Sequence, residues 1–261
     1  MNVPTSARVV IIGGGVIGCS VAYHLAKKGW SDVVLMERKR MTSGTTWHAA
    51  GLIGQLRASS TMTKLAKYSA DLYINLEAET GIATGLRQTG SISVALTEER
   101  REELLRSASM ARAFGVPVED ISPAEVKERY PYLETSDVTH GVFLPTDGQG
   151  DPANIALALA KGARQNGALT LEGVKVTGVR RDGDRVTSVD WESETGEAGH
   201  TACDHVVIAS GMWGREVGKM AGVNIPLQAC EHFYIVTEAI DKLGNLPVLR
   251  VPDECAYYKE D

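Results

Sequence analysis

The feature that most constrains this chain is a run of glycines that directly follows its first apolar segment. Residues 8–12 read RVVII, a short β-branched run typical of a strand buried on both faces. The turn GGGVIG follows at 13–18, and residues 19–29 carry apolar side chains at helical spacing up to Gly29, which should end the helix. Residues 33–36 (VVLM) form a second buried run. Strand, glycine turn, helix and strand in this order predict a right-handed βαβ unit.

The spacing of these glycines is that of a turn which binds a pyrophosphate. Gly13 permits the tight turn, Gly15 lets the backbone approach the phosphates, and Gly18 lets the helix pack closely on the strand. The N–H groups and the dipole at the helix start favour an anion there. Glu37 lies 19 residues beyond Gly18, where its carboxylate can bind both hydroxyls of an adenosine ribose. We therefore expect a dinucleotide site; a purely structural glycine turn is the alternative.

The continuation after Glu37 favours FAD over NAD as this dinucleotide. A nicotinamide-binding Rossmann half continues with a further helix and strand, so that the substrate binds where the strand order reverses. Here residues 38–56 are polar without a clear period, and the apolar strand pattern returns only about 170 residues later, at 205–209 (HVVIA) with Ser210 and Gly211. Such an interruption fits the two-domain plan of flavoproteins. An NAD-dependent dehydrogenase is the alternative.

The rest of the chain alternates between helix and strand patterns. Helices are expected at 61–79, at 97–114, from the capping box at 122–125 onwards, at 151–167 and from 211 to 222. Strands are expected at 91–96, 141–144 and 227–237, with two or three more within 169–191 around a turn at Asp182-Gly183. The predicted fold class is α/β. An FAD-binding Rossmann-like domain at 1–90 with 145–222 is interleaved with a discontinuous α+β substrate domain at 91–144 with 223–261, and the chain looks truncated at its C-terminus.

Composition and charge disfavour several classes of protein. The net charge is −6, which argues against a nucleic-acid or anionic-membrane surface. No apolar run approaches the roughly 18 residues of a membrane span, and the first eight residues lack a signal-peptide pattern. The cytoplasm, or the mitochondrial matrix for a mature eukaryotic chain, is therefore the expected location. No disulfide framework and no metal site is expected from the spacing of Cys19, Cys203, Cys230, Cys255, His24, His140, His200 and His205.

Three segments resemble one family of flavoenzymes. Residues 42–52 (TSGTTWHAAGL) resemble the dimethylglycine and sarcosine dehydrogenase family, whose members have the D-amino-acid-oxidase-like fold. Residues 145–152 (PTDGQGDP) and 209–218 (ASGMWGREVG) are similar to two further motifs of that family, and the resemblance extends over the whole chain. It implies FAD as cofactor, with a methyl carbon of its ring system covalently bonded to His48. Such a bond raises the flavin potential and helps the flavin accept a hydride from an amine.

The same resemblance implies which residues bind the cofactor and the substrate. A strand at 231–234 (EHFY) should bring Tyr234 and His232 to the flavin and the amine, although Phe233 stands where the family has Gln. Ser210 likewise stands where the family has Ala, and the Val176 backbone should meet the adenine. The residues that should line the FAD are Gly13, Gly15, Ile17, Gly18, Glu37, Arg38, Ser43, Gly44, Thr45, Thr46, Trp47, His48, Val176, Ala209, Gly211 and Trp213.

The activity that this resemblance implies is the oxidation of N-methylated glycine derivatives such as dimethylglycine and sarcosine. A hydride would pass from the N-methyl carbon of the neutral amine to flavin N5, and the electrons then to an electron-transfer flavoprotein or to oxygen. Members of the family continue with further substrate-domain strands and a folate-binding module. A non-catalytic FAD-binding fragment that needs such a missing part is therefore a second alternative.

Overall fold

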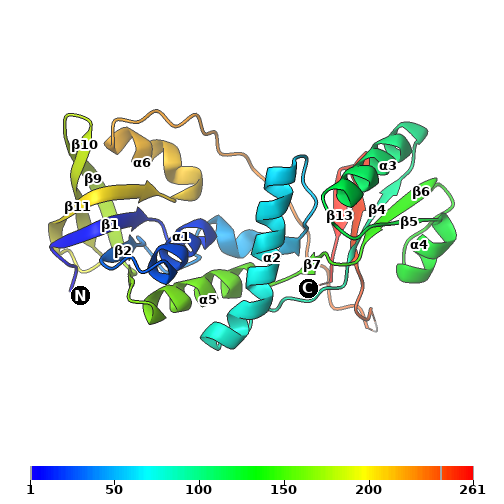
Figure 1. The fold of residues 1–261 in the computed structure, drawn as a ribbon, viewed down its shortest axis with the longest axis horizontal. Helices are drawn as coiled ribbons and strands as arrows, with labels where there is room; N and C mark the ends of the chain where they lie inside the picture. The colour runs from blue at the N-terminus through cyan, green and yellow to red at the C-terminus, as the bar shows by residue number, and fades with distance from the viewer. Residues whose placement is uncertain (1, 242, 261) are drawn as a thin grey trace. The chain divides into compact units, whose positions relative to one another are not determined.

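The computed structural model describes residues 2–241 and 243–260, drawn as a ribbon in Figure 1. The chain divides into two compact units, each with its own sheet and its own buried core. Unit 1 comprises Met1–Ala50, Asn75–Thr84 and Pro152–Phe233, and unit 2 comprises Gly51–Ile74, Gly85–Asp151 and Tyr234–Asp261. The predicted α/β class, built from interleaved segments, is confirmed.

Unit 1 contains a six-stranded mixed sheet (Figure 1). Its strands are β1 (Ser6–Ile12), β2 (Val33–Met36), β8 (Leu169–Leu171), β9 (Val174–Asp182), β10 (Arg185–Ser193) and β11 (Ala198–Ile208). Their order is β8-β2-β1-β11-β10-β9, with β8, β2, β1 and β11 parallel and the last two strands antiparallel. The helical segments of this unit are α1 (Val16–Lys27), η1 (Thr45–His48), α5 (Pro152–Gln165), η2 (Gly211–Trp213) and α6 (Gly214–Met220).

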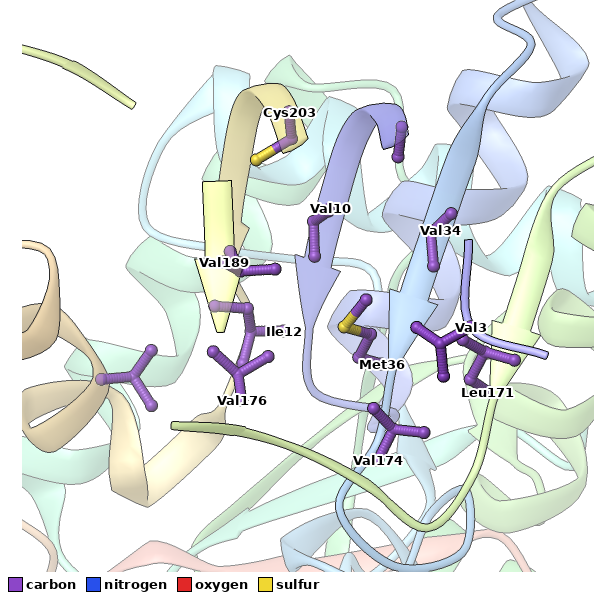
Figure 2. Packing of buried hydrophobic residues seen from close by; sticks show 12 residues of the cluster. Val3, Val10, Ile12, Val34, Met36, Leu171, Val174, Val176, Val189 and Cys203 are labelled. Carbon is purple, nitrogen blue, oxygen red and sulfur yellow. The ribbon is translucent and has the colours of Figure 1, made fainter. Parts of the chain in front are cut away.

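The apolar runs seen in the sequence form the core of this sheet. Val10 of β1 and Met36 of β2 are fully buried and belong to one cluster with Val174 and Val176 of β9 and Val189 of β10 (Figure 2). The second run, residues 33–36, is buried at every position. Burial of this apolar surface stabilises the sheet.

Gly29 ends α1, as the sequence predicts. Its φ is +79°, a conformation that glycine adopts without a steric penalty. The Gly29 N–H donates to the Ala26 carbonyl at 2.9 Å, and the Trp30 N–H donates to the Leu25 carbonyl at 3.0 Å. These two bonds form a Schellman motif, which satisfies the last carbonyl groups of the helix.

Unit 2 contains a five-stranded sheet and a short strand pair. Its sheet has the order β13-β12-β4-β6-β5, from β4 (Ser91–Ala95), β5 (Glu119–Ile121), β6 (His140–Leu144), β12 (Val248–Val251) and β13 (Ala256–Tyr258). The strand pair joins β3 (Leu52–Ile53) to β7 (Gly148–Gln149). Its further helical segments are α3 (Glu98–Ala113), α4 (Pro123–Arg129) and η3 (Pro252–Glu254).

The remaining helix, α2 (Ser60–Thr80), has 21 residues and contributes to both units. Its length and position agree with the helix expected at 61–79. Within residues 2–241 and 243–260, no helix combines the length and the apolarity that crossing a membrane requires.

The structure confirms two predicted local features. The capping box of α4 is formed, because Ser122 Oγ accepts from the Glu125 N–H and the Glu125 carboxylate accepts from the Ser122 N–H at 2.7 Å. The turn at Asp182-Gly183 joins β9 to β10, and Gly183 has a φ of +56°. Both features depend on residues close together in the sequence, which is why the sequence predicts them.

The prediction of a strand at 227–237 is wrong. Residues 223–240 form neither helix nor strand, and the side chains of Phe233 and Ile235 are 89% and 91% exposed. The apolar pattern of this segment is that of a strand, but no described strand pairs with it. A strand needs a neighbour to satisfy its backbone groups, so pattern alone does not create one.

The limits of the two units also differ from the expected domain limits. Residues 51–74, 85–90 and 145–151 were expected in the nucleotide-binding domain and belong to unit 2, whereas 223–233 belongs to unit 1. The pairing of β3 with β7 accounts for part of this difference, because it holds 52–53 and 148–149 in the same unit. Nothing in the sequence of these short strands identifies their partners.

Candidate dinucleotide-binding site

The glycine turn begins where β1 ends, beside the C-terminal ends of its two neighbouring strands, β2 and β11, in the sheet of unit 1. The register pairs Ile12, the last residue of β1, with the last residues of β2 and β11, and the three strands are parallel. Gly13, Glu37 and Ala209 therefore follow the sheet at one edge. Ligands of open parallel sheets bind beyond the carboxyl ends of the strands.

Two of the glycines have no room for a side chain. Gly13 has a φ of +114°, and a Cβ there would lie 2.5 Å from the Ala209 carbonyl oxygen. A Cβ on Gly18 would lie 1.9 Å from the Gly13 carbonyl oxygen. Gly13 thus makes the turn, and Gly18 lets α1 pack directly against it.

The first turn of α1 leaves backbone donors free. Within the described part of the chain, the N–H groups of Gly15 and Ile17 have no hydrogen-bond partner, whereas the Val16 N–H donates to Thr46 Oγ1 at 3.0 Å. Free N–H groups at a helix start attract an anion such as a phosphate. The lack of a side chain at Gly15 keeps this backbone accessible.

The carboxylate of Glu37 is fixed across the turn by two backbone groups. Its Oε2 accepts from the Gly14 N–H at 2.7 Å, and its Oε1 accepts from the Lys39 N–H at 2.9 Å. Each carboxylate oxygen has two lone pairs, so each can accept one further hydrogen bond. This carboxylate is therefore held at the end of β2 with capacity for two hydroxyl groups.

The segment that carries His48 is tied to the glycine turn at two points. The Thr42 N–H donates to the Gly14 carbonyl at 2.9 Å. Thr42 itself has a φ of +69°, which is rare for a β-branched residue. The second tie comes from Thr46, a residue that is 9% exposed, whose hydroxyl accepts from the Val16 N–H at the start of α1.

A second set of contacts joins the segment after β2 to the segment after β11. The Trp213 ring lies so close to Gly44 that a Cβ on this glycine would be 3.2 Å from it. The Arg38 guanidinium lies 4.1 Å from the centre of the same ring, a cation–π contact. Thr45 Oγ1 is 3.9 Å from the Met212 sulfur. The predicted FAD-lining residues Arg38, Gly44, Thr45 and Trp213 therefore lie together.

The three predicted residues Ser43, Trp47 and His48 are exposed. The Trp47 and His48 rings contact each other, with centroids 3.6 Å apart and planes inclined by 34°. Among the described residues, no hydrogen bond reaches the His48 imidazole. Its ring nitrogens are therefore accessible.

The other predicted cofactor residues also belong to unit 1. Val176 is 6% exposed and its side chain lies in the core, on a strand whose first residue, Val174, donates from its N–H to the Glu37 carbonyl at 2.9 Å. Ala209 follows β11, and Gly211 begins η2 with a φ of +54°. The structure thus brings the backbone near Val176 to the strand end that carries Glu37.

The two predicted catalytic residues are not brought to this set. His232 and Tyr234 lie in the segment without secondary structure, and the Tyr234 side chain is 59% exposed. His232 belongs to unit 1 and Tyr234 to unit 2. The active-site strand expected at 231–234 is therefore not formed.

Sequence reasoning missed two residues that build the turn. Gly14 donates to Glu37, and a Cβ on it would lie 2.4 Å from the Met41 sulfur. The Glu172 carboxylate accepts from the Met41 N–H at 2.6 Å. The unbroken GGG run at 13–15 was a signal for Gly14, whereas Glu172 lies 131 residues from its partner and carries no local signal.

These features fit a ligand with a pyrophosphate, a ribose and a flat apolar ring system. Ile17, Trp47 and Met212 are 64%, 55% and 46% exposed, although large apolar side chains are more often buried. Ser210 Oγ, two residues beyond the end of β11, is buried without a hydrogen-bond partner in the described part of the chain. Exposed apolar side chains beside free backbone donors are what a dinucleotide would cover.

No residue of this set lines the hollows found in unit 2. One hollow of about 670 Å³ lies between residues 56–58 and α3, and another of about 260 Å³ lies beside β4 and residues 133–138. Within residues 2–241 and 243–260, no group of three or more His, Cys, Asp or Glu could hold a metal ion.

Comparison with known proteins connects this geometry to a family. The family model described as "DAO: FAD dependent oxidoreductase" matches residues 8–259. Mitochondrial sarcosine dehydrogenase from Homo sapiens is 42% identical, over 98% of this chain and 28% of that protein. The mitochondrial pyruvate dehydrogenase phosphatase regulatory subunit from Mus musculus is 42% identical, over 98% of this chain and 29% of that protein. The crystal structure of L-proline dehydrogenase from P. horikoshii has a TM-score of 0.82 at 27% identity, covering 95% of this chain and 64% of that one.

The chain spans less than a third of the length of these two curated relatives. The family match agrees with FAD rather than NAD as the dinucleotide, and the resemblance seen in residues 42–52 is confirmed. Since the family model covers nearly the whole chain, including the glycine turn and the strand end at Glu37, the chain belongs to the DAO family of FAD-dependent oxidoreductases.

Proposed function

We propose that unit 1 binds FAD at the glycine turn and is the flavin-binding part of an enzyme that oxidises N-methylated glycine derivatives. The observation that carries this proposal is the common exit of β1, β2 and β11, where free backbone donors lie beside a fixed carboxylate. The N–H groups of Gly15 and Ile17 would bind the pyrophosphate, and Glu37 would bind the ribose hydroxyls. The backbone near Val176 would meet the adenine.

We further propose that the flavin is attached to His48. The accessible imidazole would lose its N–H proton as a nitrogen–carbon bond forms to a methyl group of the ring system, which loses one C–H proton. Bound flavin would take up the two electrons lost at that carbon, and molecular oxygen would be their final acceptor, forming hydrogen peroxide. The exposure of His48 and its lack of a hydrogen-bond partner among the described residues support this role.

The substrate would be a small amine such as sarcosine or dimethylglycine. Bound FAD would supply the two-electron chemistry that takes a hydride at N5. His232 or Tyr234 would hold the amine, which must be neutral because a protonated amine cannot release a hydride. The electron acceptor would be an electron-transfer flavoprotein or oxygen, in the cytoplasm or the mitochondrial matrix.

A non-catalytic FAD-binding role is the second candidate. It is favoured by one observation: a regulatory subunit is as similar to this chain, at 42% identity, as sarcosine dehydrogenase is. The two candidates differ in one outcome, because only the enzyme would lose its flavin absorbance when sarcosine or dimethylglycine is added without oxygen.

The test of the attachment is acid precipitation of the purified full-length protein, followed by an absorbance spectrum of the pellet. We expect flavin to stay with the wild-type polypeptide and to wash out of the His48→Ala variant. A His205→Ala variant is the matched control, because His205 is an exposed histidine of the same unit outside the site, and it should keep its flavin. Flavin that washes free from the wild type would contradict the attachment while leaving FAD binding intact; a colourless protein would contradict both.

A further inference from the structure

The hydroxyl of Ser210 is buried beside the glycine turn without a hydrogen-bond partner among the described residues. Ser210 is the N-cap of η2, a position where a serine hydroxyl normally accepts from a backbone N–H. Its side chain makes no such capping bond. Helix capping therefore does not account for this hydroxyl.

A buried hydroxyl without a partner lowers the stability of a fold, because it has lost its hydrogen bonds to water. Most buried polar side chains in proteins are paired, so an unpaired one calls for a reason. Ser210 as a residue is only half-buried, so part of it borders the surface of unit 1. Rotation about its χ1 torsion redirects the hydroxyl without moving the backbone. A ligand with an acceptor atom at this surface would therefore restore the lost hydrogen bond.

Ser210 lies directly against the glycine turn. A Cβ on Gly13 would lie 3.0 Å from the Ser210 Cα. Further along the turn, the N–H groups of Gly15 and Ile17 have no partner within the described part of the chain. The hydroxyl and these N–H groups are all hydrogen-bond donors, a set that suits the oxygen atoms of an anion.

The order of the strands indicates which part of a dinucleotide Ser210 would meet. Strand β1 lies between β2 and β11. Glu37, at the end of β2, and Ser210, beyond the end of β11, therefore lie on opposite sides of the glycine turn. Since the ribose is assigned to Glu37, a ligand that extends from there across the turn brings its pyrophosphate, and not its adenosine, toward Ser210.

We propose that the Ser210 hydroxyl donates a hydrogen bond to a pyrophosphate oxygen of FAD, beside the N–H groups of Gly15 and Ile17. This inference rests on the proposed binding of FAD at the glycine turn. The bond is charge-assisted, because its acceptor is anionic. It replaces an unpaired hydroxyl in the flavin-free protein by a paired one in the complex, so Ser210 contributes to FAD affinity and not to the stability of the free protein.

The test uses the full-length protein with His48→Ala, in which FAD binds without attachment, so that flavin fluorescence gives its dissociation constant. Adding Ser210→Ala should weaken FAD binding roughly 10- to 100-fold, the loss of a hydrogen bond to a charged group. Because the unpaired hydroxyl is removed, the same change should raise the melting temperature of the flavin-free protein by about 2 °C or more.

Ser193→Ala in the same protein is the matched control, because the buried Ser193 of β10 has a paired hydroxyl. Its Oγ bonds to Thr195 Oγ1 at 2.9 Å and accepts from the Glu197 N–H at 3.0 Å. Loss of these bonds should lower the melting temperature and leave FAD binding unchanged. The two serine variants should therefore shift the melting temperature in opposite directions.

ADP carries the pyrophosphate without the flavin, so it identifies the group that the hydroxyl contacts. In isothermal titration calorimetry, Ser210→Ala should weaken ADP binding by about the same factor as FAD binding. Unchanged ADP binding would overturn the assignment to the pyrophosphate.

Unchanged FAD binding with a lower melting temperature in Ser210→Ala would overturn the whole proposal, because the hydroxyl would then stabilise the fold instead. A protein that keeps Ser210 and binds neither FAD nor ADP would contradict the proposed FAD site itself.

Discussion

Cys19 and Cys203 are buried in unit 1, and burial changes their chemistry. Desolvation raises the pKa of Cys19 to about 12, with a further increase from the nearby Glu37 carboxylate, and raises the pKa of Cys203 to about 11. Cys230 and Cys255 are exposed. Only a thiolate reacts readily with an alkylating agent, so the buried pair should be unreactive in the folded protein.

We expect iodoacetamide at pH 8 to modify Cys230 and Cys255 of the native protein, and all four cysteines only in denaturant. Peptide mass spectrometry reads the result. Because the folded pKa values lie above the unfolded value of 9.0, the stability that these two thiols contribute is fully present below pH 9 and is lost as the pH rises toward 11 to 12. Rapid native modification of Cys19 would show that the core around α1 is more open than described.

At the scale of single elements, α1 depends on two glycines for different reasons. Gly18 faces the glycine turn, and any Cβ there would overlap the Gly13 carbonyl oxygen at 1.9 Å. Gly29 needs a positive φ of +79°, but a Cβ there would meet nothing within 4 Å. One position is limited by space and the other by backbone conformation.

Replacing each glycine by alanine separates these two limits. Gly18→Ala should lower the free energy of unfolding by about 3 kcal/mol or more, because a backbone clash forces α1 away from the strand end. Gly29→Ala should cost about 1–2 kcal/mol, the penalty of a left-handed conformation with a side chain. Urea unfolding followed by circular dichroism measures both, and FAD binding should fail first in Gly18→Ala. Equal destabilisation of the two variants would contradict the packing of α1 against the turn.

At the scale of the molecule, residues 223–240 lie in the chain between α6 of unit 1 and β12 of unit 2. The segment has no helix or strand, and it exposes Phe233, Tyr234 and Ile235. Exposed backbone without secondary structure is where proteases cut first, because it fits their extended binding sites without unfolding of the core.

We therefore expect chymotrypsin, at a low ratio to the full chain, to cleave first after Phe233 or Tyr234. Intact-mass spectrometry identifies the fragments. A variant with Phe233→Gly and Tyr234→Gly should remain intact several-fold longer. Tyr132→Gly is the control, because Tyr132 is an exposed aromatic residue (56%) outside this segment, and this variant should be cleaved at the wild-type rate. A first cleavage within residues 2–222 would show that this segment is protected.

Much of the fold follows from short stretches of sequence. The runs at 8–12 and 33–36, the glycine turn between them and the capping box at Ser122 each act within a few residues, so their patterns predict the structure found. The segment 227–237 has an equally clear strand pattern and forms no strand, because pairing requires a partner that the pattern does not name.

In the candidate site, too, some features follow from local sequence and others only from tertiary structure. Gly13, Gly15, Gly18 and Glu37 could be identified from spacing alone, since a βαβ unit fixes their distance along the chain. The Arg38–Trp213 contact and the bond from Val16 to Thr46 could not be inferred, because each joins residues that only the packed sheet brings together.

By itself, therefore, the sequence determined that a glycine turn follows a buried strand and that an acidic residue ends the next one, because these are local consequences of apolar pattern and glycine geometry. Tertiary structure alone decided that β11 ends in register with β1 and β2, and that His48 lies on a segment fastened to the start of α1. Both depend on contacts between residues far apart in the chain. A local sequence pattern cannot predict the free energy of such contacts.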